Sequence, residues 1–401
     1  MNMKHLITFI LATIVSSASA LACTSVIITS KASKDGRPMI FKNRDTGSLS
    51  NICIERQGTL YRYVGIANAR DTIPQEIWGG HNEKGFAIIN TADYNLNEKN
   101  EKEELEGEIM RIALGECATL ADFEKFLDQR ERPLCVNTNY GVIDAHGGCA
   151  YYEVGNNGYV KYDANDPSVA PEGYLLRTNY GFSGDQTKNQ GCERYLAIAE
   201  FMKKAQKDDN IDATYLITHI PRYVTHGLTH INLLDYMPET EKDTTMMPFR
   251  DYIPRHSTAS CLLVQGVRTN EPAAFTTSWL YVGYPLTTVC MPVILNPENR
   301  LPQTFISRED GTAWMAEKGL ELKKRLFPYT VSNGKDYINV AQLYNKCGTG
   351  IQQKLQPVEA KIIRKALDTI NDMRKKGKIT PTLYNFYDWA DNYIRQHFST
   401  L

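Results

Sequence analysis

The order of strand-like and helix-like segments constrains the fold of this chain more than any other feature. Strands are indicated where β-branched and aromatic residues cluster between turn signals, and helices where apolar residues recur at intervals of three and four. Strands, two helices, strands, helices, strands and helices follow one another, an order that suits two sheets between helical layers. We expect strands at 24–30, 38–45, 60–67, 75–79, 86–91, 138–145, 148–154, 158–163, 258–265, 273–281 and 286–294. Helices are expected at 108–117, 120–130, 192–206 and 211–219, and the tail, 311–325 and 357–398, is expected to be mostly helical.

The fold class that this order predicts is α+β, a four-layer αββα sandwich with a mostly helical C-terminal extension. Thr119 is the expected N-cap of the helix at 120–130. The stretch 95–108 is charged and is expected to be a solvated loop rather than part of a site. The domain prediction is a signal peptide at 1–22, one domain at 23–310 and the extension at 311–401, packed on the same domain.

The first 22 residues have the form of a secretory signal peptide. Lys4 precedes an apolar run, and the run ends in small residues with Ala20-Leu21-Ala22 at the close. The run is too short to span a membrane, and no later stretch has about 18 consecutive apolar residues. We therefore expect an exported protein, periplasmic or extracellular, whose mature chain begins at Cys23.

Two alternatives for Cys23 stay open at this point. In the first alternative Cys23 forms a disulfide. In the second it is the acylated cysteine of a bacterial lipoprotein. The lipoprotein alternative fits poorly because Ala20 stands where such signals usually have leucine. The chain has nine cysteines, and an odd number in an exported protein often leaves one special thiol.

Composition excludes some classes of partner. The formal net charge is −1 over 401 residues, whereas a nucleic-acid-binding chain needs a strongly basic face. We expect no nucleic acid, no membrane span, no metal site and no cofactor, and the oligomeric state stays open, a homo-oligomer included.

A cysteine at a new N-terminus has chemical consequences. Thiolate is the attacking form of cysteine, and a free α-amino group, with a pKa of about 7.7–8.0, can accept the thiol proton near neutral pH. Both groups lie on one residue, so they are always close together. The turn at Asp35-Gly36 predicts a hairpin that brings Cys23 near the K-N-R-D segment, which ends at Asp45.

Several short motifs together resemble a known group of enzymes. C-T-S-V-I begins at Cys23, and K-N-R-D, G-H-N-E-K-G-F-A-I, R-T-N-Y-G and C-E-R-Y-L follow it in order. In this order the chain resembles the N-terminal-nucleophile (Ntn) amide hydrolases. It is most similar to the penicillin acyltransferase and choloylglycine hydrolase group, which includes bile salt hydrolases and penicillin V acylases. The resemblance covers about 23–295 and implies the αββα fold.

The resemblance also implies roles for particular residues. Cys23 matches the nucleophile, with its amine as the base, and Asp45 matches the aspartate that contacts that amine. Asn179 matches the oxyanion-hole asparagine, and Arg194 matches an arginine that orders the site. Asn90 is the candidate for a second oxyanion contact, with the main chain of 91–92 as the alternative.

Lys42 stands where the group commonly has arginine, so the positive charge is kept and the bidentate fork is lost. Three of the six residues also have a purely structural explanation: Asp45 as a turn cap, Asn179 as a turn residue and Arg194 as a surface ion-pair partner.

The predicted function is an exported cysteine Ntn hydrolase. It cleaves the linear amide of an N-acyl amino acid, a conjugated bile acid, a penicillin-like molecule or a small peptide through an acyl-enzyme on Cys23, with transfer to an acceptor other than water left open. A dipeptidase of the same superfamily is the first alternative. A lipid-anchored envelope protein that binds without cleaving is the alternative from another class, and Lys42 leaves room for an inactive relative.

Overall fold

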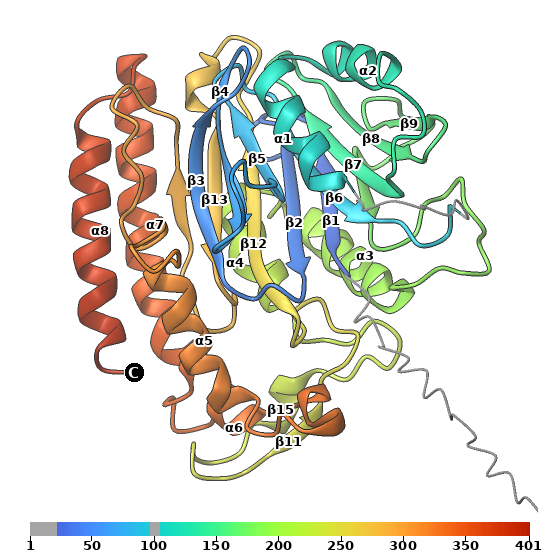
Figure 1. Ribbon diagram of the computed structural model, residues 1–401. Helices are drawn as coiled ribbons and strands as arrows, with labels where there is room; N and C mark the ends of the chain where they lie inside the picture. The colour runs from blue at the N-terminus through green and yellow to red at the C-terminus, as the bar shows by residue number, and fades with distance from the viewer. Residues whose placement is uncertain (1–21, 97–104) are drawn as a thin grey trace, which may run out of the picture.

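The computed structural model describes residues 22–96 and 105–401 (Figure 1). The predicted signal peptide therefore lies outside the described residues except for Ala22, and the charged stretch predicted at 95–108 lies outside them at 97–104. No helix in the described ranges is long and apolar enough to cross a membrane.

Two antiparallel sheets form the centre of the molecule. The first has the strand order β10-β1-β2-β12-β13-β14, and the second runs from β3 to β9 in sequence order. The first sheet comprises β1 (Thr24–Ile28), β2 (Met39–Asp45), β10 (Tyr174–Arg177), β12 (Thr258–Gln265), β13 (Thr277–Val282) and β14 (Met291–Val293). The second comprises β3 (Asn51–Gln57), β4 (Arg62–Asn68), β5 (Gly79–Asn82), β6 (Ala87–Ala92), β7 (Thr138–Ile143), β8 (Cys149–Val154) and β9 (Tyr159–Asp163).

The two sheets pack face to face. Strands β1 and β2 contact β6 and β7, and β12 contacts β5. Every residue of β1, β2 and β12 is buried, which is the pattern of strands that are covered on both faces. Gly141 allows a close approach here, since a Cβ atom at this position would lie 3.0 Å from the side chain of Ile27 on the facing sheet.

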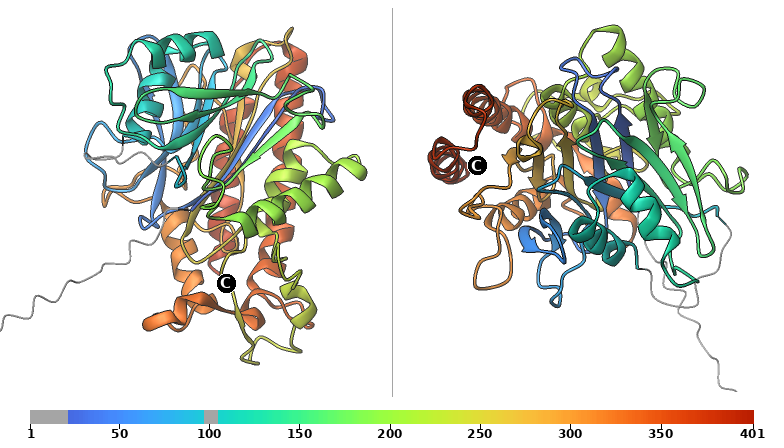
Figure 2. Two further views of the ribbon diagram at one scale, coloured as in Figure 1. Left: turned by 90° about the vertical axis from the view of Figure 1, so that its right-hand side faces the viewer. Right: turned by 90° about the horizontal axis from the view of Figure 1, so that it is seen from above.

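Helices cover the outer faces of both sheets, which completes four layers (Figures 1 and 2). Over the second sheet lie α1 (Glu106–Glu116) and α2 (Leu120–Asp128), and over the first lie α3 (Cys192–Lys207) and α4 (Ala213–His219). Thr119 caps α2 as predicted, because its side chain accepts a hydrogen bond from the backbone of Asp122. The predicted α+β fold class and its αββα layers are confirmed.

The C-terminal segment is mostly helical and packs beside the first sheet, where α7 contacts β14. The stretch 357–398, which was expected to be mostly helical, lies in two helices, because Gly377 ends the first of them in the left-handed conformation, with φ of +68°. The domain boundary at 310 stays a prediction. The segment contains α5 (Trp314–Leu326), α6 (Val340–Leu343), α7 (Ile351–Lys376) and α8 (Thr382–Phe398), and β15 (Tyr337–Asn339) pairs with β11 (Met246–Pro248).

Some predicted strands were wrong in place or extent. The strand expected at 75–79 begins only at Gly79, and β3 was not predicted. The strand expected at 286–294 is confined to Met291–Val293, because the hydroxyl groups of Thr287 and Thr288 bond back to the carbonyl of Tyr284 and hold a turn. The strand expected at 273–281 begins at Thr277, after a short 3-10 helix.

Candidate active site

The hairpin of β1 and β2 places Cys23 beside the K-N-R-D segment. The strands pair antiparallel, with Thr24 opposite Asn43 and Ser25 opposite Lys42, and Cys23 directly precedes β1. Cys23 is buried and lines a cavity of about 220 Å³ between the two sheets. The walls of this cavity also include Lys42, Asp45 and Asn90, so four of the six predicted site residues share one cavity.

Asn179 and Arg194 reach Cys23 through hydrogen bonds. The backbone N–H of Cys23 donates to Oδ1 of Asn179 over 2.9 Å. Arg194 donates to the backbone carbonyl of Cys23, to Oδ1 of Asn179 over 2.7 Å and to Oγ1 of Thr24 over 3.1 Å. The structure therefore brings all six predicted residues together around the position of Cys23, although their roles stay predictions.

Local structure explains how Asn179 and Arg194 come together. Asn179 lies two residues past β10, which pairs with β1, and Arg194 lies in the first turn of α3, which packs on the same strands. Arg194 is only 1 % exposed, so the alternative that it is a surface ion-pair partner is wrong. One N–H of the Asn179 amide donates to the carbonyl of Ala92 over 3.0 Å.

Asp45 lies at the end of β2 in a buried polar cluster. Its Oδ1 accepts hydrogen bonds from the Thr258 hydroxyl over 2.6 Å and from the Asn43 amide over 3.0 Å. Nε of Arg255 lies 3.8 Å from Oδ2, and within the described chain Oδ2 accepts no hydrogen bond. Burial raises the pKa of this carboxyl to about 6, although the nearby charges of Arg255 and Arg194 oppose the rise.

Lys42 and Asn90 form a bonded pair across the two sheets. Nζ of Lys42 donates to Oδ1 of Asn90 over 2.6 Å and to the carbonyl of Trp78 over 2.9 Å. The Asn90 amide donates to the Thr138 hydroxyl over 3.3 Å. Burial lowers the pKa of Lys42 to about 8, and Cys23 is the nearby group that most opposes this fall. Lys42 is therefore a buried amine whose charge depends on pH near neutrality.

The cavity wall also contains residues that were not predicted from the sequence, among them Arg44, Trp78 and Glu106. The guanidinium of Arg44 lies over the Trp78 ring, 4.6 Å from its centre, and donates to the amide oxygens of Asn51 and Asn68. A signal for Arg44 was present, because residues two apart on a strand share a face and Arg44 is two residues from Lys42.

Glu106 corrects one prediction. The stretch 95–108 was expected to be solvated, but Glu106 is buried where α1 begins and faces the cavity. No short motif marks it, because its position depends on how α1 packs against the second sheet.

Metal-ligand geometry is not found in the ranges that the structure describes. No group of three or more His, Cys, Asp or Glu side chains there is arranged to hold an ion. The nine cysteines all lie in those ranges, and none is in a disulfide.

Comparisons with known proteins agree with the motifs. The sequence model of the family described as "Acyl-coenzyme A:6-aminopenicillanic acid acyl-transferase" matches residues 33–229. That segment begins after Cys23 and contains the other five predicted residues. No curated protein matches the chain in sequence.

Solved structures also show similarity. A mutant of the conjugated bile acid hydrolase from Clostridium perfringens has 11 % identity and a TM-score of 0.38, covering 70 % of this chain and 93 % of its own. The penicillin V acylase from Agrobacterium tumefaciens has 12 % identity and a TM-score of 0.34, covering 68 % and 86 %. A Caenorhabditis elegans ortholog of N-acylethanolamine-hydrolyzing acid amidase has 17 % identity and a TM-score of 0.37, covering 49 % and 84 %.

The family match and the observed fold support an enzyme of the amide hydrolase or acyltransferase type. The resemblance indicated by the motifs is thereby confirmed: over residues 33–229 the chain is similar to the acyl-coenzyme A:6-aminopenicillanic acid acyl-transferase family.

Proposed function

We propose that the chain is an exported cysteine amidase that begins at Cys23 once its first 22 residues have been removed. It cleaves the linear amide of an N-acyl amino acid, a conjugated bile acid, a penicillin-like molecule or a small peptide. One observation carries the proposal: Cys23 lines a cavity with Lys42, Asp45 and Asn90, while Asn179 and Arg194 hold its backbone.

Cleavage of the chain changes the chemistry of the Cys23 nitrogen. Before cleavage it is a peptide N–H that donates to Asn179, and afterwards it is an α-amine in the same place. The amine takes the thiol proton, and the thiolate attacks the substrate carbonyl carbon. Asp45 lines the same cavity, and its carboxylate, when ionised, supports the ammonium that results.

The tetrahedral intermediate carries its negative charge on the former carbonyl oxygen. Amide donors from Asn179 and from Asn90, or the main chain of 91–92, stabilise that charge. When the C–N bond breaks, the ammonium of Cys23 returns a proton to the leaving amine and a thioester remains on Sγ. Water then releases the acid, or an amine or thiol acceptor takes the acyl group. The charge of Lys42 stabilises the thiolate.

The test uses the mature chain, prepared so that it begins at Cys23. A panel of N-acyl amino acids, glycine and taurine conjugates of bile acids, penicillin V and dipeptides is incubated with it, and the released amine is quantified. Preference for the dipeptides would identify the dipeptidase alternative. Mass spectrometry of the chain during turnover should show the acyl group of the substrate on Cys23.

Two cysteine variants make this test specific. Cys23→Ala should abolish release of the amine, whereas Cys347→Ser, which changes an exposed cysteine, should leave it unchanged. A correctly processed Cys23→Ser chain that retains full activity would contradict the proposal.

A further inference from the structure

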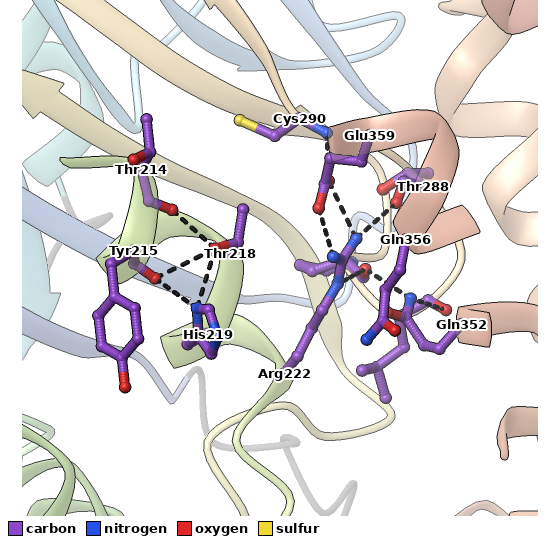
Figure 3. Close-up of polar contacts among 12 residues, drawn as sticks. Thr214, Tyr215, Thr218, His219, Arg222, Thr288, Cys290, Gln352, Gln356 and Glu359 are labelled. Carbon is purple, nitrogen blue, oxygen red and sulfur yellow. Dashed lines mark hydrogen bonds and ion pairs between the residues drawn. The ribbon is translucent and has the colours of Figure 1, made fainter. Parts of the chain in front are cut away.

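A second and larger cavity lies on the helical side of the first sheet. It has a volume of about 630 Å³ and opens between α3, α4 and α7. It shares no lining residue with the Cys23 cavity. Figure 3 shows Tyr215 and His219 of α4 on one side, Gln356 and Glu359 of α7 on the other, and Arg222 between them. A volume of this size is within the range of about 300–1,000 Å³ that is usual for small-molecule sites.

Aromatic rings form much of the wall. The rings of Tyr215 and His219 stack with their centres 4.1 Å apart, and Phe201 stacks on Tyr215 at 5.9 Å. Tyr223 meets Phe201 edge to face at 5.4 Å, and Tyr344 adds a further ring to the wall. Such walls favour a flat aromatic ligand, because a ring can add to an existing stack.

Charge at this cavity is balanced. Arg222 and Glu359 form an ion pair whose side chains are 5 % and 3 % exposed. Arg222 also donates to the carbonyl of Thr288 over 3.2 Å, and Glu359 accepts from the backbone N–H of Cys290 over 2.8 Å. Glu200 and Lys204 add one charge of each sign to the lining. A ligand with net charge would gain little binding free energy here, since the buried charges of Arg222 and Glu359 are already paired with each other.

His219 provides a hydrogen-bond acceptor. Its Nδ1 lies 2.9 Å from the carbonyl of Tyr215 and 2.9 Å from the Thr218 hydroxyl. The carbonyl only accepts, and that hydroxyl donates its own proton to the carbonyl of Thr214 over 2.7 Å, so Nδ1 carries the proton in both contacts. In the neutral ring Nε2 is then an acceptor, and it suits a ligand with a hydroxyl or N–H donor.

We propose that this cavity is a second ligand site, which binds a neutral molecule of one or two aromatic rings bearing a hydroxyl or N–H group. The site is independent of the chemistry at Cys23 and goes beyond the proposed function.

The probe for the test is N-phenyl-1-naphthylamine, a neutral two-ring fluorophore with one N–H. Titrated into the full mature chain, it should give a saturable fluorescence increase with one site per chain. Alkylation of Cys23 with iodoacetamide, carried out in the Cys347→Ser chain so that this exposed cysteine does not react, should leave the binding unchanged, because the two cavities share no residue.

Variants locate the probe. Ala360 is an exposed residue of α7 at the cavity wall, so Ala360→Trp should fill the cavity and weaken binding at least about tenfold. Asp368→Trp, on the same helix but outside the cavity, is the matched control and should bind like the parent. His219→Ala, at an exposed position, should weaken binding about fivefold through loss of one hydrogen bond, and it tests the site even if Ala360→Trp does not fold.

Three results would overturn the proposal: no saturable binding, equal affinity of the parent and both cavity variants, or loss of binding after alkylation of Cys23. The last result would place the probe in the Cys23 cavity instead.

Discussion

Arg194 bonds both to the backbone carbonyl of Cys23 and, over 2.7 Å, to Oδ1 of Asn179, the same oxygen that accepts the N–H of Cys23. One buried guanidinium thus fixes the position of Cys23 relative to the asparagine. Lysine cannot reproduce this arrangement, because it offers a single point of charge instead of a planar fork.

Replacing Arg194 should therefore reduce activity without abolishing folding. We expect Arg194→Lys to lower kcat/KM by about 100-fold, the loss typical of a reacting group displaced by about 1 Å. Steady-state kinetics with the best substrate of the panel measures the change. Arg364→Lys, at an exposed position on α7, is the control. Equal kinetics of Arg194→Lys and this control would contradict the role given to Arg194.

Lys42 should set the alkaline limit of activity. Its pKa is lowered to about 8 by burial, so its charge is lost as the pH rises through this value. If that charge stabilises the thiolate of Cys23, activity should fall above about pH 8, and Lys42→Arg should move the fall to higher pH because arginine stays charged. A pH–rate profile that is the same for both chains would show that Lys42 does not control this limit.

Asp45 should set the acidic limit. Burial raises its pKa to about 6, so the carboxylate that supports the amine is lost as the pH falls through 6. We expect activity to drop below about pH 6, and Asp45→Asn to be slow at every pH with no drop there. If Asp45→Asn shows the same loss of activity below about pH 6 as the parent, another titrating group causes that loss.

The raised pKa of Asp45 affects stability in the opposite direction from activity. Because the pKa of Asp45 is higher in the folded chain than its ordinary value of 3.8, the folded state binds more protons between about pH 4 and 6. The contribution of Asp45 to the free energy of unfolding therefore falls as the pH rises through that window. Urea unfolding gives the change in the free energy of unfolding between pH 4 and pH 7. This change should be less destabilising for Asp45→Asn than for the parent, and an equal change in the two chains would refute this assignment.

Arg177 and Glu153 should be important for the stability of the segment that leads to Asn179. Their side chains are fully buried and 2.9 Å apart, and the Arg177 guanidinium lies 3.8 Å from the centre of the Phe182 ring. Glu153 also accepts the backbone N–H groups of Phe182 and Ser183. We expect Arg177→Met to lower the free energy of unfolding by about 3–5 kcal/mol, because it leaves a buried carboxylate without its partner.

Urea denaturation measures this loss. The double variant Arg177→Met/Glu153→Gln is the matched comparison, and it should lose less because no unpaired buried charge remains. A double variant that is less stable than Arg177→Met would contradict the ion-pair explanation.

Sequence alone predicted the layers of the fold, because the order of strand-like and helix-like segments suits few arrangements of sheets and helices. It also predicted that Cys23 and Asp45 would be close, since a tight turn joins their strands. The cavity wall was less predictable. Trp78 and Glu106 reach it through the packing of a loop and of α1, and the hydroxyl of Thr258 reaches Asp45 from a strand more than 200 residues away. Such contacts depend on tertiary packing rather than on local pattern.

The most direct test of the central claim is the mass of the N-terminal peptide of the protein exported by its own host. The account predicts a peptide that begins at Cys23 with a free amine and a free thiol. A Cys23 that carries a diacylglyceryl group, or a mature chain that begins elsewhere, would contradict it, because neither form offers an N-terminal amine and thiol on the same residue.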